Sequence, residues 1–434
     1  MSMTRENIVE YVLDELKKAG ADKASCSVAK GRKEEFNVEA NKFSLLRTLF
    51  DDALAIKALC GGRKGVAVVN KLDKDSIDKA IVDCISLSKL ATPDEAEDIA
   101  PKHENKSFSR EIGGSDMNKL FKRSKEFLEQ TLDEYPKIML EGMTSVFGSG
   151  QATYGNSNGV LFNDSSESYG MGSSFVAKDG EKSSSFNFYG ANMLDLSTPF
   201  LDLGMQRALF EESIKSLDTR TLEGKFVGKI ILTPACDDMI WGTLFDCFLT
   251  DRSLIEGTSR WKDLLGTKVV DKKLTMRTVP HHPSIISGER FTGDGFESFD
   301  TDIIKDGVLE SFALSLYGAN KTGNKRTANT AFSNIEVVAG DISLAEMIKG
   351  VDRGILFNRF SGASPSPSGD ISGVAKNSFY IEDGKVTDAI SETMVSFNIV
   401  DILQDIVAIS KEQIMDGGSI LPWCCFDGIT ISGK

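Results

Sequence analysis

The chain is 434 residues long, 41% of them hydrophobic and 26% charged, with a formal net charge of −14. This length predicts two or three domains, and the composition is that of an ordinary globular protein. The 64 acidic residues outnumber the 50 basic ones, which argues against nucleic-acid binding. No apolar run approaches the ~18–20 residues of a membrane span, and the N-terminus lacks a signal-peptide pattern. We therefore expect a cytoplasmic protein without membrane contact.

Cysteine and histidine usage limits the possible chemistry. The seven cysteines have no repeated spacing, and without an export signal we expect reduced, mostly buried thiols. The only histidines are His103, His281 and His282. His281 and His282 lie between two prolines, where neighbouring side chains point in opposite directions, so we expect a turn and not a metal site. His103 lies in a polar loop and is expected to be exposed.

The first half of the chain predicts helices separated by blocks of strands. Thr4 can cap an opening helix whose apolar face runs from Ile8 to Leu16 and which Gly20 ends. The Gly61-Gly62 pair suits a tight turn between strands. In chain order we expect strands at 25–30, 35–39, 45–50, 53–59 and 65–70, a helix after Asp75, a loop at 92–115, a helix from about Asp116 with Phe121 facing inward, strands within 137–194, and a helix at 199–217.

The second half predicts more hairpins than strand–helix–strand units, as does the first. Its expected elements are a strand at 229–232, a helix at 237–249, hairpin turns at Asp306-Gly307 and Asp383-Gly384, and helices at 343–349 and 398–410. This pattern favours an α+β fold of two domains with antiparallel or mixed sheets and packed helices. The polar segment 218–228 places the boundary between domains 1–220 and 221–434.

Common catalytic and nucleotide-binding motifs are missing. The sequence contains no G-x-S-x-G elbow, no P-loop and no strand-following G-x-G-x-x-G. The acidic series Asp294, Glu297, Asp300 and Asp302 does not have EF-hand spacing, and we expect a solvated loop there.

The predicted helix at 237–249 is apolar over most of its surface. Its two i, i+4 rows consist of Ile240, Leu244 and Phe248, and of Trp241, Phe245 and Leu249. Such a helix is a core helix. Gly242 in the middle of this helix lowers helix stability by about 1 kcal/mol relative to alanine. Its presence indicates either that another part of the molecule approaches the helix backbone closely or that selection at this position is relaxed.

Several short segments together form a fairly specific pattern. They are residues 52–56, 63–65, 91–94 and 155–160 in the first half, and 306–309, 322–324, 354–356, 368–375 and 381–386 in the second. Through these segments the chain resembles, nearly end to end, the PmbA (TldE) type of the TldD/PmbA family, whose members are also called modulators of DNA gyrase.

The resemblance implies a place in a metallopeptidase system. In this family the TldD type carries zinc on an H-E-x-x-x-H helix, with a cysteine near the C-terminus, and cleaves peptides. The PmbA type shares the fold but lacks the motif. By resemblance, this chain pairs with a TldD-like subunit as a heterodimer, or with itself, and the substrates are unfolded peptides. Zinc is expected only in the TldD-like partner.

The metal motif can be transferred residue by residue. The tripeptide at 257–259 matches the G-T-S that follows the motif in TldD. Counting back without gaps places the first histidine on Gly242, the glutamate on Thr243 and the second histidine on Cys247, and the C-terminal cysteine falls on Gly417. Glycine offers no side-chain donor, and threonine cannot replace the glutamate as a base. We therefore expect a degenerate site and a non-catalytic subunit.

Two alternatives remain open. Cys247, alone as a nucleophile or together with Cys424 or Cys425 as thiolates, could make the chain a hydrolase with an unconventional site. We nevertheless expect Cys424 and Cys425 in a buried strand near the C-terminus. Alternatively, the acidic surface could make the chain an interaction protein related to gyrase.

Overall fold

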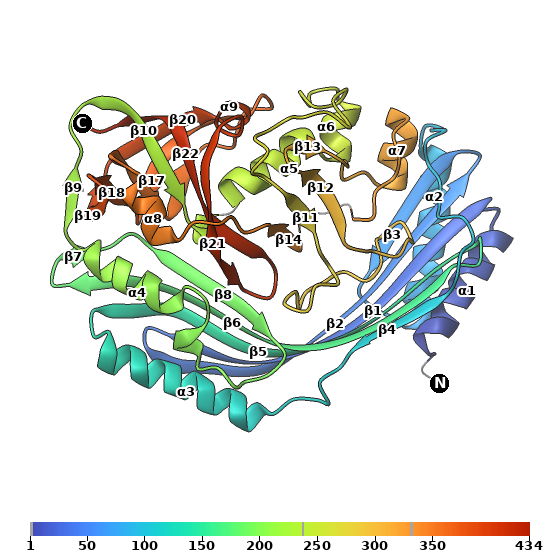
Figure 1. Ribbon diagram of the computed structural model, residues 1–434. Coiled ribbons are helices and arrows are strands. Elements are labelled where there is room, and N and C mark those ends of the chain that lie inside the picture. The colour runs from blue at the N-terminus through green and yellow to red at the C-terminus, as the bar shows by residue number, and fades with distance from the viewer. Residues whose placement is uncertain (1–2, 237, 330–332) are drawn as a thin grey trace.

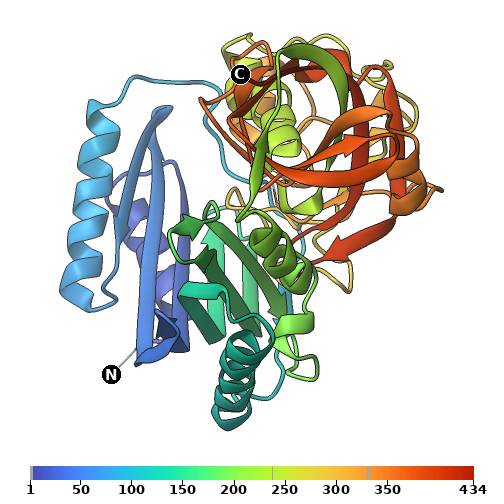
Figure 2. The same cartoon turned by 90° about the vertical axis from the view of Figure 1, so that its left-hand side faces the viewer.

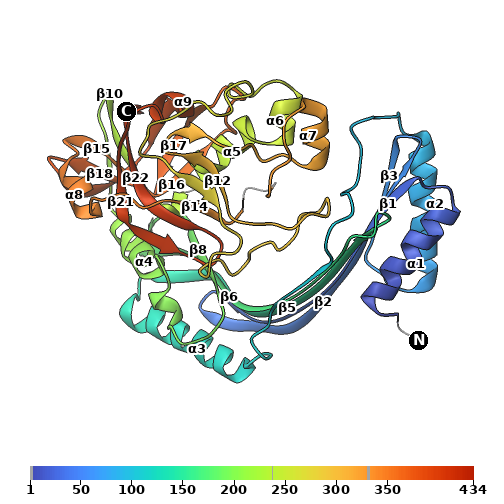
Figure 3. The same ribbon diagram turned by 45° about the vertical axis from the view of Figure 1, so that its right-hand side comes forward.

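Two α+β domains with antiparallel and mixed sheets follow one another along the chain, which confirms the predicted fold class. The computed structural model describes residues 3–236, 238–329 and 333–434. The first domain is a strongly curved sheet, and the second domain lies against its concave side (Figures 1 and 2). Helices cover the convex side of the curved sheet at its two ends (Figure 3).

Long antiparallel hairpins build the curved sheet. Its strands are β1 (Lys23–Glu39), β2 (Lys42–Cys60), β3 (Arg63–Val69), β4 (Lys106–Arg110), β5 (Ile138–Asn156), β6 (Leu161–Asp179), β7 (Lys182–Ser183) and β8 (Asn187–Met193). Their order is β3-β2-β1-β5-β6-β4, with β7 and β8 paired to β6. Only the β4–β6 pairing is parallel. Gly61 and Gly62 both have positive φ at the β2–β3 turn, a conformation that glycine adopts without strain.

The helices of the first domain pack by their apolar faces. They are α1 (Arg5–Lys18), α2 (Lys74–Leu90), α3 (Met117–Glu134) and α4 (Gln206–Lys215), with a 3₁₀ turn, η1 (Phe200–Asp202), before α4. The side chains of Thr4, Asp73 and Asp116 cap the first three. Helices α1 and α2 share one core with the β1–β2 end of the sheet, and α3 and α4 share a second core with β5 and β6.

The second domain has a larger mixed sheet centred on its last strand. The strands are β9 (Thr219–Thr221), β10 (Lys225–Leu232), β11 (Met276–Thr278), β12 (Thr301–Lys305), β13 (Val308–Leu309), β14 (Ile335–Val337), β15 (Arg353–Phe357), β16 (Arg359–Gly362), β17 (Asp370–Lys376), β18 (Phe379–Glu382), β19 (Lys385–Ser391), β20 (Thr393–Asn398), β21 (Ile406–Met415) and β22 (Ile420–Ser432). Strand β22 pairs with β10, β14, β20 and β21.

Short helices surround this sheet. They are α5 (Thr243–Phe248), α6 (Asp251–Ile255), α7 (Leu316–Thr322), α8 (Leu344–Lys349) and α9 (Ile399–Ile402), with a 3₁₀ turn, η2 (Pro234–Cys236), and a π-helical turn, η3 (Asp238–Gly242), before α5. None of the helices in the described ranges is long and apolar enough to cross a membrane.

An aromatic contact joins the two domains. Phe291, in the loop before β12, stacks on Phe162 of β6 with ring centroids 5.2 Å apart, and it also faces Phe108 of β4. On the same side, Arg110 Nη1 donates hydrogen bonds to the carbonyl oxygens of Ile285 and Ile286, at 2.5 and 2.6 Å. The loop is therefore anchored to the curved sheet by both apolar and polar contacts.

Several predicted elements were wrong in extent. The five short strands predicted within 25–70 are three long ones, because β1 and β2 pair with each other without a break through residues 31–34 and 51–52, where gaps were predicted. The loop predicted at 92–115 contains β4, which pairs with β6. The helix predicted at 398–410 ends at Ile402, because residues from Ile406 onward pair with β22 as strand β21.

One predicted inward side chain lies at the surface. Phe121 of α3 is 40% exposed and contacts the ring of Phe43 in β2, with centroids 5.2 Å apart.

Candidate functional site

The segment expected to correspond to the family's metal helix is a buried helix, as its apolar rows predict. Residue 237, at the start of the prediction, lies outside the described residues. A π-helical turn, Asp238–Gly242, leads into α5. The side chains of Ile240, Leu244 and Phe248, and those of Trp241 and Phe245, are all buried. Close packing fixes this helix in the core of the second domain.

One side of this helix borders a cavity of about 810 Å³. Gly242, Thr243 and Cys247 line it from the helix, and Arg252 and Glu256 line it from α6 and its C-terminal end. Ser364, Pro365 and Pro367, from the loop between β16 and β17, complete the wall. Three of the four positions transferred from the zinc motif therefore border one cavity.

Cys247 is a protonated thiol at this cavity. Its Sγ donates to the carbonyl oxygen of Ser366 at 3.5 Å. Partial burial, and to a lesser extent the neighbouring Asp246 carboxylate, raise the pKa of Cys247. A raised pKa disfavours the thiolate, which is the form that binds metal or attacks a substrate.

Thr243 and Gly242 supply no base or ligand in their present arrangement. The Thr243 hydroxyl donates to the carbonyl oxygen of Met239 at 2.6 Å, one helical turn back. Its proton is therefore committed to the helix backbone. Gly242 has no side chain, so this wall of the cavity offers only backbone at that position.

Gly417 contacts other parts of the molecule. Its carbonyl oxygen accepts hydrogen bonds from the backbone N–H groups of Ile286 and Ser287. A Cβ added to Gly417, whose φ is +84°, would lie 2.4 Å from the carbonyl oxygen of Asn192 in β8. The fourth position of the motif thus lies in the β21–β22 turn, packed on the first domain, and is not among the residues that line the cavity.

Cys424 and Cys425 are buried in β22, as predicted. Both are fully inaccessible and lie on opposite faces of the strand, Cys424 in the main core and Cys425 in a smaller one. Burial raises the pKa of Cys424 strongly and that of Cys425 to about 12. Neither thiol has the exposure or the low pKa of a reactive cysteine.

The donors around the cavity do not fit a catalytic zinc ion. Such an ion takes three protein ligands and an open position for water. Within 3–236, 238–329 and 333–434, no group of three or more His, Cys, Asp or Glu side chains is arranged to hold a metal ion. Among the described residues that line the cavity, Cys247 supplies the only sulfur, and its proton is donated to a carbonyl oxygen.

A polar network holds the loop that forms the cavity wall. Ser366 and Ser368 donate to the Asp370 carboxylate at 2.9 and 2.6 Å, and Asn398 donates to its other oxygen at 2.9 Å. These hydrogen bonds lower the pKa of Asp370 to about 2. Gly369, with φ at +90°, packs against Phe248 of α5. Residues 368–375 served in the sequence only to support the family resemblance, and the serine–proline repeat before them carries no chemical motif that would have placed this loop at the site.

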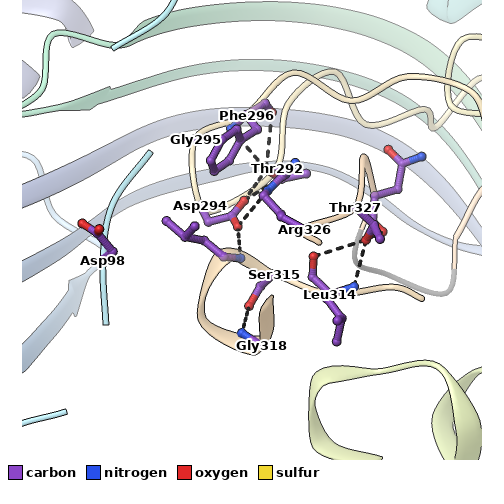
Figure 4. A network of polar contacts seen from close by, with 12 residues as sticks. Asp98, Thr292, Asp294, Gly295, Phe296, Leu314, Ser315, Gly318, Arg326 and Thr327 are labelled. Carbon is purple, nitrogen blue, oxygen red and sulfur yellow. Dashed lines mark hydrogen bonds and ion pairs between the residues drawn. The ribbon is translucent and has the colours of Figure 1, made fainter. Parts of the chain in front are cut away.

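The acidic residues from Asp294 to Asp302 were predicted to lie in a solvated loop, and only some of them are exposed to solvent. Asp294 is largely enclosed and points toward Arg326 (Figure 4), which donates to it from Nε at 3.2 Å. Asp294 also accepts from the hydroxyl of Thr292 and from the Leu316 N–H at 2.7 Å. Together these contacts lower the pKa of Asp294 despite its burial. Asp294 therefore fixes the start of α7, while Asp300 remains exposed.

The three histidines take structural positions. His281 and His282 lie in a turn, as predicted, and His282 Nδ1 accepts from the Ser284 N–H at 3.1 Å. The expected exposure of His103 was wrong. Its Nε2 lies 2.8 Å from the Gly295 carbonyl oxygen, and its ring stacks on Phe162, because the two domains meet there.

Comparisons with known proteins agree with this architecture. The model of the PmbA/TldA metallopeptidase C-terminal domain matches residues 225–433. Metalloprotease PmbA of Escherichia coli O157:H7 is 25% identical over 395 residues, covering 86% of this chain and 85% of that protein. The crystal structure of TldE from Thermococcus kodakarensis covers 98% of this chain and 100% of its own, with a TM-score of 0.82 and 20% identity.

A second solved structure is equally similar. A protein from Bacteroides thetaiotaomicron, described as a DNA gyrase modulator, covers 99% of this chain and 100% of its own, with a TM-score of 0.85 and 21% identity. These features define a two-domain protein in which a metallopeptidase-type C-terminal domain follows a curved-sheet domain. Over nearly its whole length the chain is similar to PmbA and TldE proteins, and its second domain matches the PmbA/TldA metallopeptidase C-terminal domain.

Proposed function

We propose that this chain is the PmbA-like subunit of a TldD/PmbA-type metallopeptidase system and has no zinc site of its own. In this role it pairs with a TldD-like subunit, which holds the zinc, and helps to enclose unfolded peptide substrates. The chain's own cavity then contributes a binding wall and no reacting group.

One observation carries the proposal. The helix at Gly242, Thr243 and Cys247 borders a sizeable cavity, yet it presents no carboxylate or imidazole at these three positions. A catalytic zinc site needs three ligands and a base beside the bound water. The size of the cavity and the side chains at these three positions support a wall that binds peptide, with the zinc ligands and the base supplied by a partner subunit.

Metal analysis tests the proposal directly. The purified chain is loaded with zinc, desalted and analysed, and then assayed on an unfolded peptide. We expect far less than one zinc ion per chain and no cleavage. The double variant Gly242→His/Cys247→His places two imidazoles on the cavity wall and should gain zinc affinity, which shows that the assay can detect a site there. One zinc ion per wild-type chain, together with cleavage, would refute the proposal.

The cysteine-based alternative has its own test. We expect Cys247→Ala to leave any peptide turnover by the two-subunit system unchanged, because the half-buried thiol is protonated and hydrogen-bonded. Cys60→Ala, at a half-buried cysteine of β2 in the other domain, is the matched control. Loss of turnover in Cys247→Ala alone would favour a nucleophilic cysteine.

A further inference from the structure

A second cavity, which we call the junction cavity, lies where the two domains meet. It measures about 310 Å³ and is lined by strands β4 and β6 of the curved sheet and by the loop 286–291 of the second domain. It shares no lining residue with the cavity at Cys247. Its volume lies at the lower end of the range for ligand pockets, roughly 300–1,000 Å³. The junction cavity is therefore a separate space of the size of a small ligand.

The floor of the junction cavity is the concave face of the curved sheet. Side chains two residues apart on a strand point to the same face. Phe162 of β6 stacks on Phe291 of the second domain, so this face of β6 is turned toward that domain (Figure 1). Arg110 of β4 lies opposite Ser166 of β6. The polar side chains of β6 that share the face with Phe162 and line the cavity are Asp164, Ser166 and Ser168.

The opposite wall is a loop held by hydrogen bonds. The N–H groups of Ile286 and Ser287 both donate to the Gly417 carbonyl oxygen, at 2.7 and 3.1 Å. Arg290 Nη1 donates to the Pro280 carbonyl oxygen at 3.3 Å. Arg290 is therefore kept in place at the cavity, on the side opposite the sheet.

The charged groups of the junction cavity have few partners in the protein. Among the described residues, the carboxylates of Asp164 and Glu289 take part in no hydrogen bond and no ion pair. Arg110 and Arg290 each donate through Nη1 alone, and only to carbonyl oxygens. Within the same described ranges, their Nε and Nη2 atoms have no acceptor. Both guanidiniums thus keep N–H groups for a ligand.

This lack of partners distinguishes the cavity from the rest of the domain junction. Burial raises the pKa of Asp164, and Arg290 and Arg110 offset the rise only in part. By contrast, Glu297 in the same loop region forms an ion pair with Lys106 at 2.7 Å. Partly buried charges without partners are unfavourable for folding, and in a cavity they are typical of binding sites.

The charges indicate the chemistry of the ligand. Guanidinium groups with free N–H groups bind carboxylates, often through two parallel hydrogen bonds. Asp164, whose charge interacts with both Arg110 and Arg290, is suited to accept a hydrogen bond from an N–H or ammonium group. An amino-acid residue with a free α-carboxylate carries both groups on one carbon atom. A phosphate is less suitable, because Asp164 and Glu289 would repel its second negative charge.

We propose that the junction cavity binds the α-carboxylate of a free amino acid or of the C-terminal residue of a peptide. Arg110 and Arg290 hold the carboxylate, and Asp164 accepts a hydrogen bond from the adjacent nitrogen. A peptide bound in this way would have one end anchored on the concave face of the sheet. That role for a substrate rests on the proposed function, whereas the binding itself requires neither zinc nor a partner subunit.

The two proposals fail separately. Stoichiometric zinc and cleavage on this chain would refute the proposed function and leave the junction cavity untouched. Absence of carboxylate binding would refute the junction site and leave the zinc result as it is.

Calorimetric titration of the purified full chain tests the site. The probes are L-alanyl-L-alanine and L-alanine, each compared with its C-terminal amide. We expect saturable binding of a probe with a free carboxylate, and at least about tenfold weaker binding of its amide, because charged hydrogen bonds are lost. The probe that binds more tightly identifies the source as a peptide end or a free amino acid. No binding of either probe, or equal binding of acid and amide, would overturn the proposal.

Variants test the assigned residues. Arg290→Gln should weaken binding of the acid probes at least about tenfold. Asp164→Asn should weaken L-alanine, which has an ammonium group next to its carboxylate, more than the dipeptide, which has a neutral N–H there. Ser168→Leu fills part of the cavity without removing a charge, and it should also weaken binding.

Lys106→Gln is the matched control. It removes a charge of β4 that pairs across the domain junction with Glu297, and neither residue lines the junction cavity. Binding of the acid probes should therefore be unchanged. Unchanged binding in both Arg290→Gln and Ser168→Leu, or an equal loss in Lys106→Gln, would overturn the assignment of the site.

Discussion

A half-buried carboxyl at the domain junction gives the chain a predictable response to pH. Glu212 of α4 is half-buried, and its Oε2 accepts a hydrogen bond at 2.8 Å from Asn358, in the second domain. Burial raises the pKa of Glu212 to about 7, while Lys215 and Asn358 oppose the rise only in part. The change Glu212→Gln keeps the shape and the hydrogen-bond acceptor and removes the titrating group.

The size of the stability change follows from the linkage between protonation of Glu212 and folding. A carboxyl whose pKa is raised from 4.5 to about 7 in the folded state stabilises the fold below pH 4.5 relative to high pH, and this contribution is lost as the pH rises through 7. At about 1.4 kcal/mol per pKa unit the upper limit is about 3 kcal/mol. Because the side chain is partly exposed, we expect about 1–3 kcal/mol.

The assay compares unfolding of the two proteins from pH 5 to pH 8. Relative to wild type, Glu212→Gln should gain stability steadily as the pH rises, and most of the gain should appear by pH 8. Glu211→Gln, at the exposed neighbouring residue, should show no such trend. A stability difference between Glu212→Gln and wild type that stays constant across this range would refute the reasoning.

Packing yields two further predictions. Gly65→Ala should lower the unfolding free energy by about 2–4 kcal/mol, since a Cβ there would lie 1.9 Å from the carbonyl oxygen of Cys84. The control Gly148→Ala, where a Cβ would have no atom within 4 Å, should leave the unfolding free energy nearly unchanged. Equal effects of the two changes in denaturant titration would contradict this prediction. Phe291→Ala should lower the unfolding free energy by about 3 kcal/mol, because the aromatic contact between the domains is lost. The control Phe299→Ala should lower it by less than about 1 kcal/mol, because Phe299 is 54% exposed. Similar melting temperatures of the two variants would argue against the contact.

Local signals predicted the fold wherever the cause of an element lies within a few residues. Thr4 and Asp116 cap helices because their side chains bond to backbone N–H groups three residues on, which spacing alone reveals. The continuity of β2 between the predicted strands 45–50 and 53–59 escaped prediction, because it comes from unbroken pairing with β1 and not from the strand's own pattern. Ile406 was assigned to a helix for the same reason, since only β22 makes its segment a strand.

For the candidate site too, the sequence predicted the locally determined features and missed those that depend on contacts between distant segments. The apolar rows around Trp241 predict the buried helix, and the resemblance predicts which of its residues border the cavity. Sequence could not place Gly417, because the packing of the β21–β22 turn on Asn192 is decided between domains. The Glu212–Asn358 contact joins residues 146 apart in sequence, and no local pattern encodes such a pair.

The distribution of zinc in an assembled complex tests the central claim most directly. The chain is combined with a TldD-like metallopeptidase subunit, the two are separated after zinc loading, and the metal bound to each is measured beside peptide cleavage. We predict zinc on the TldD-like subunit alone and cleavage only when that subunit is present. Stoichiometric zinc on this chain, with cleavage by this chain alone, would contradict the account.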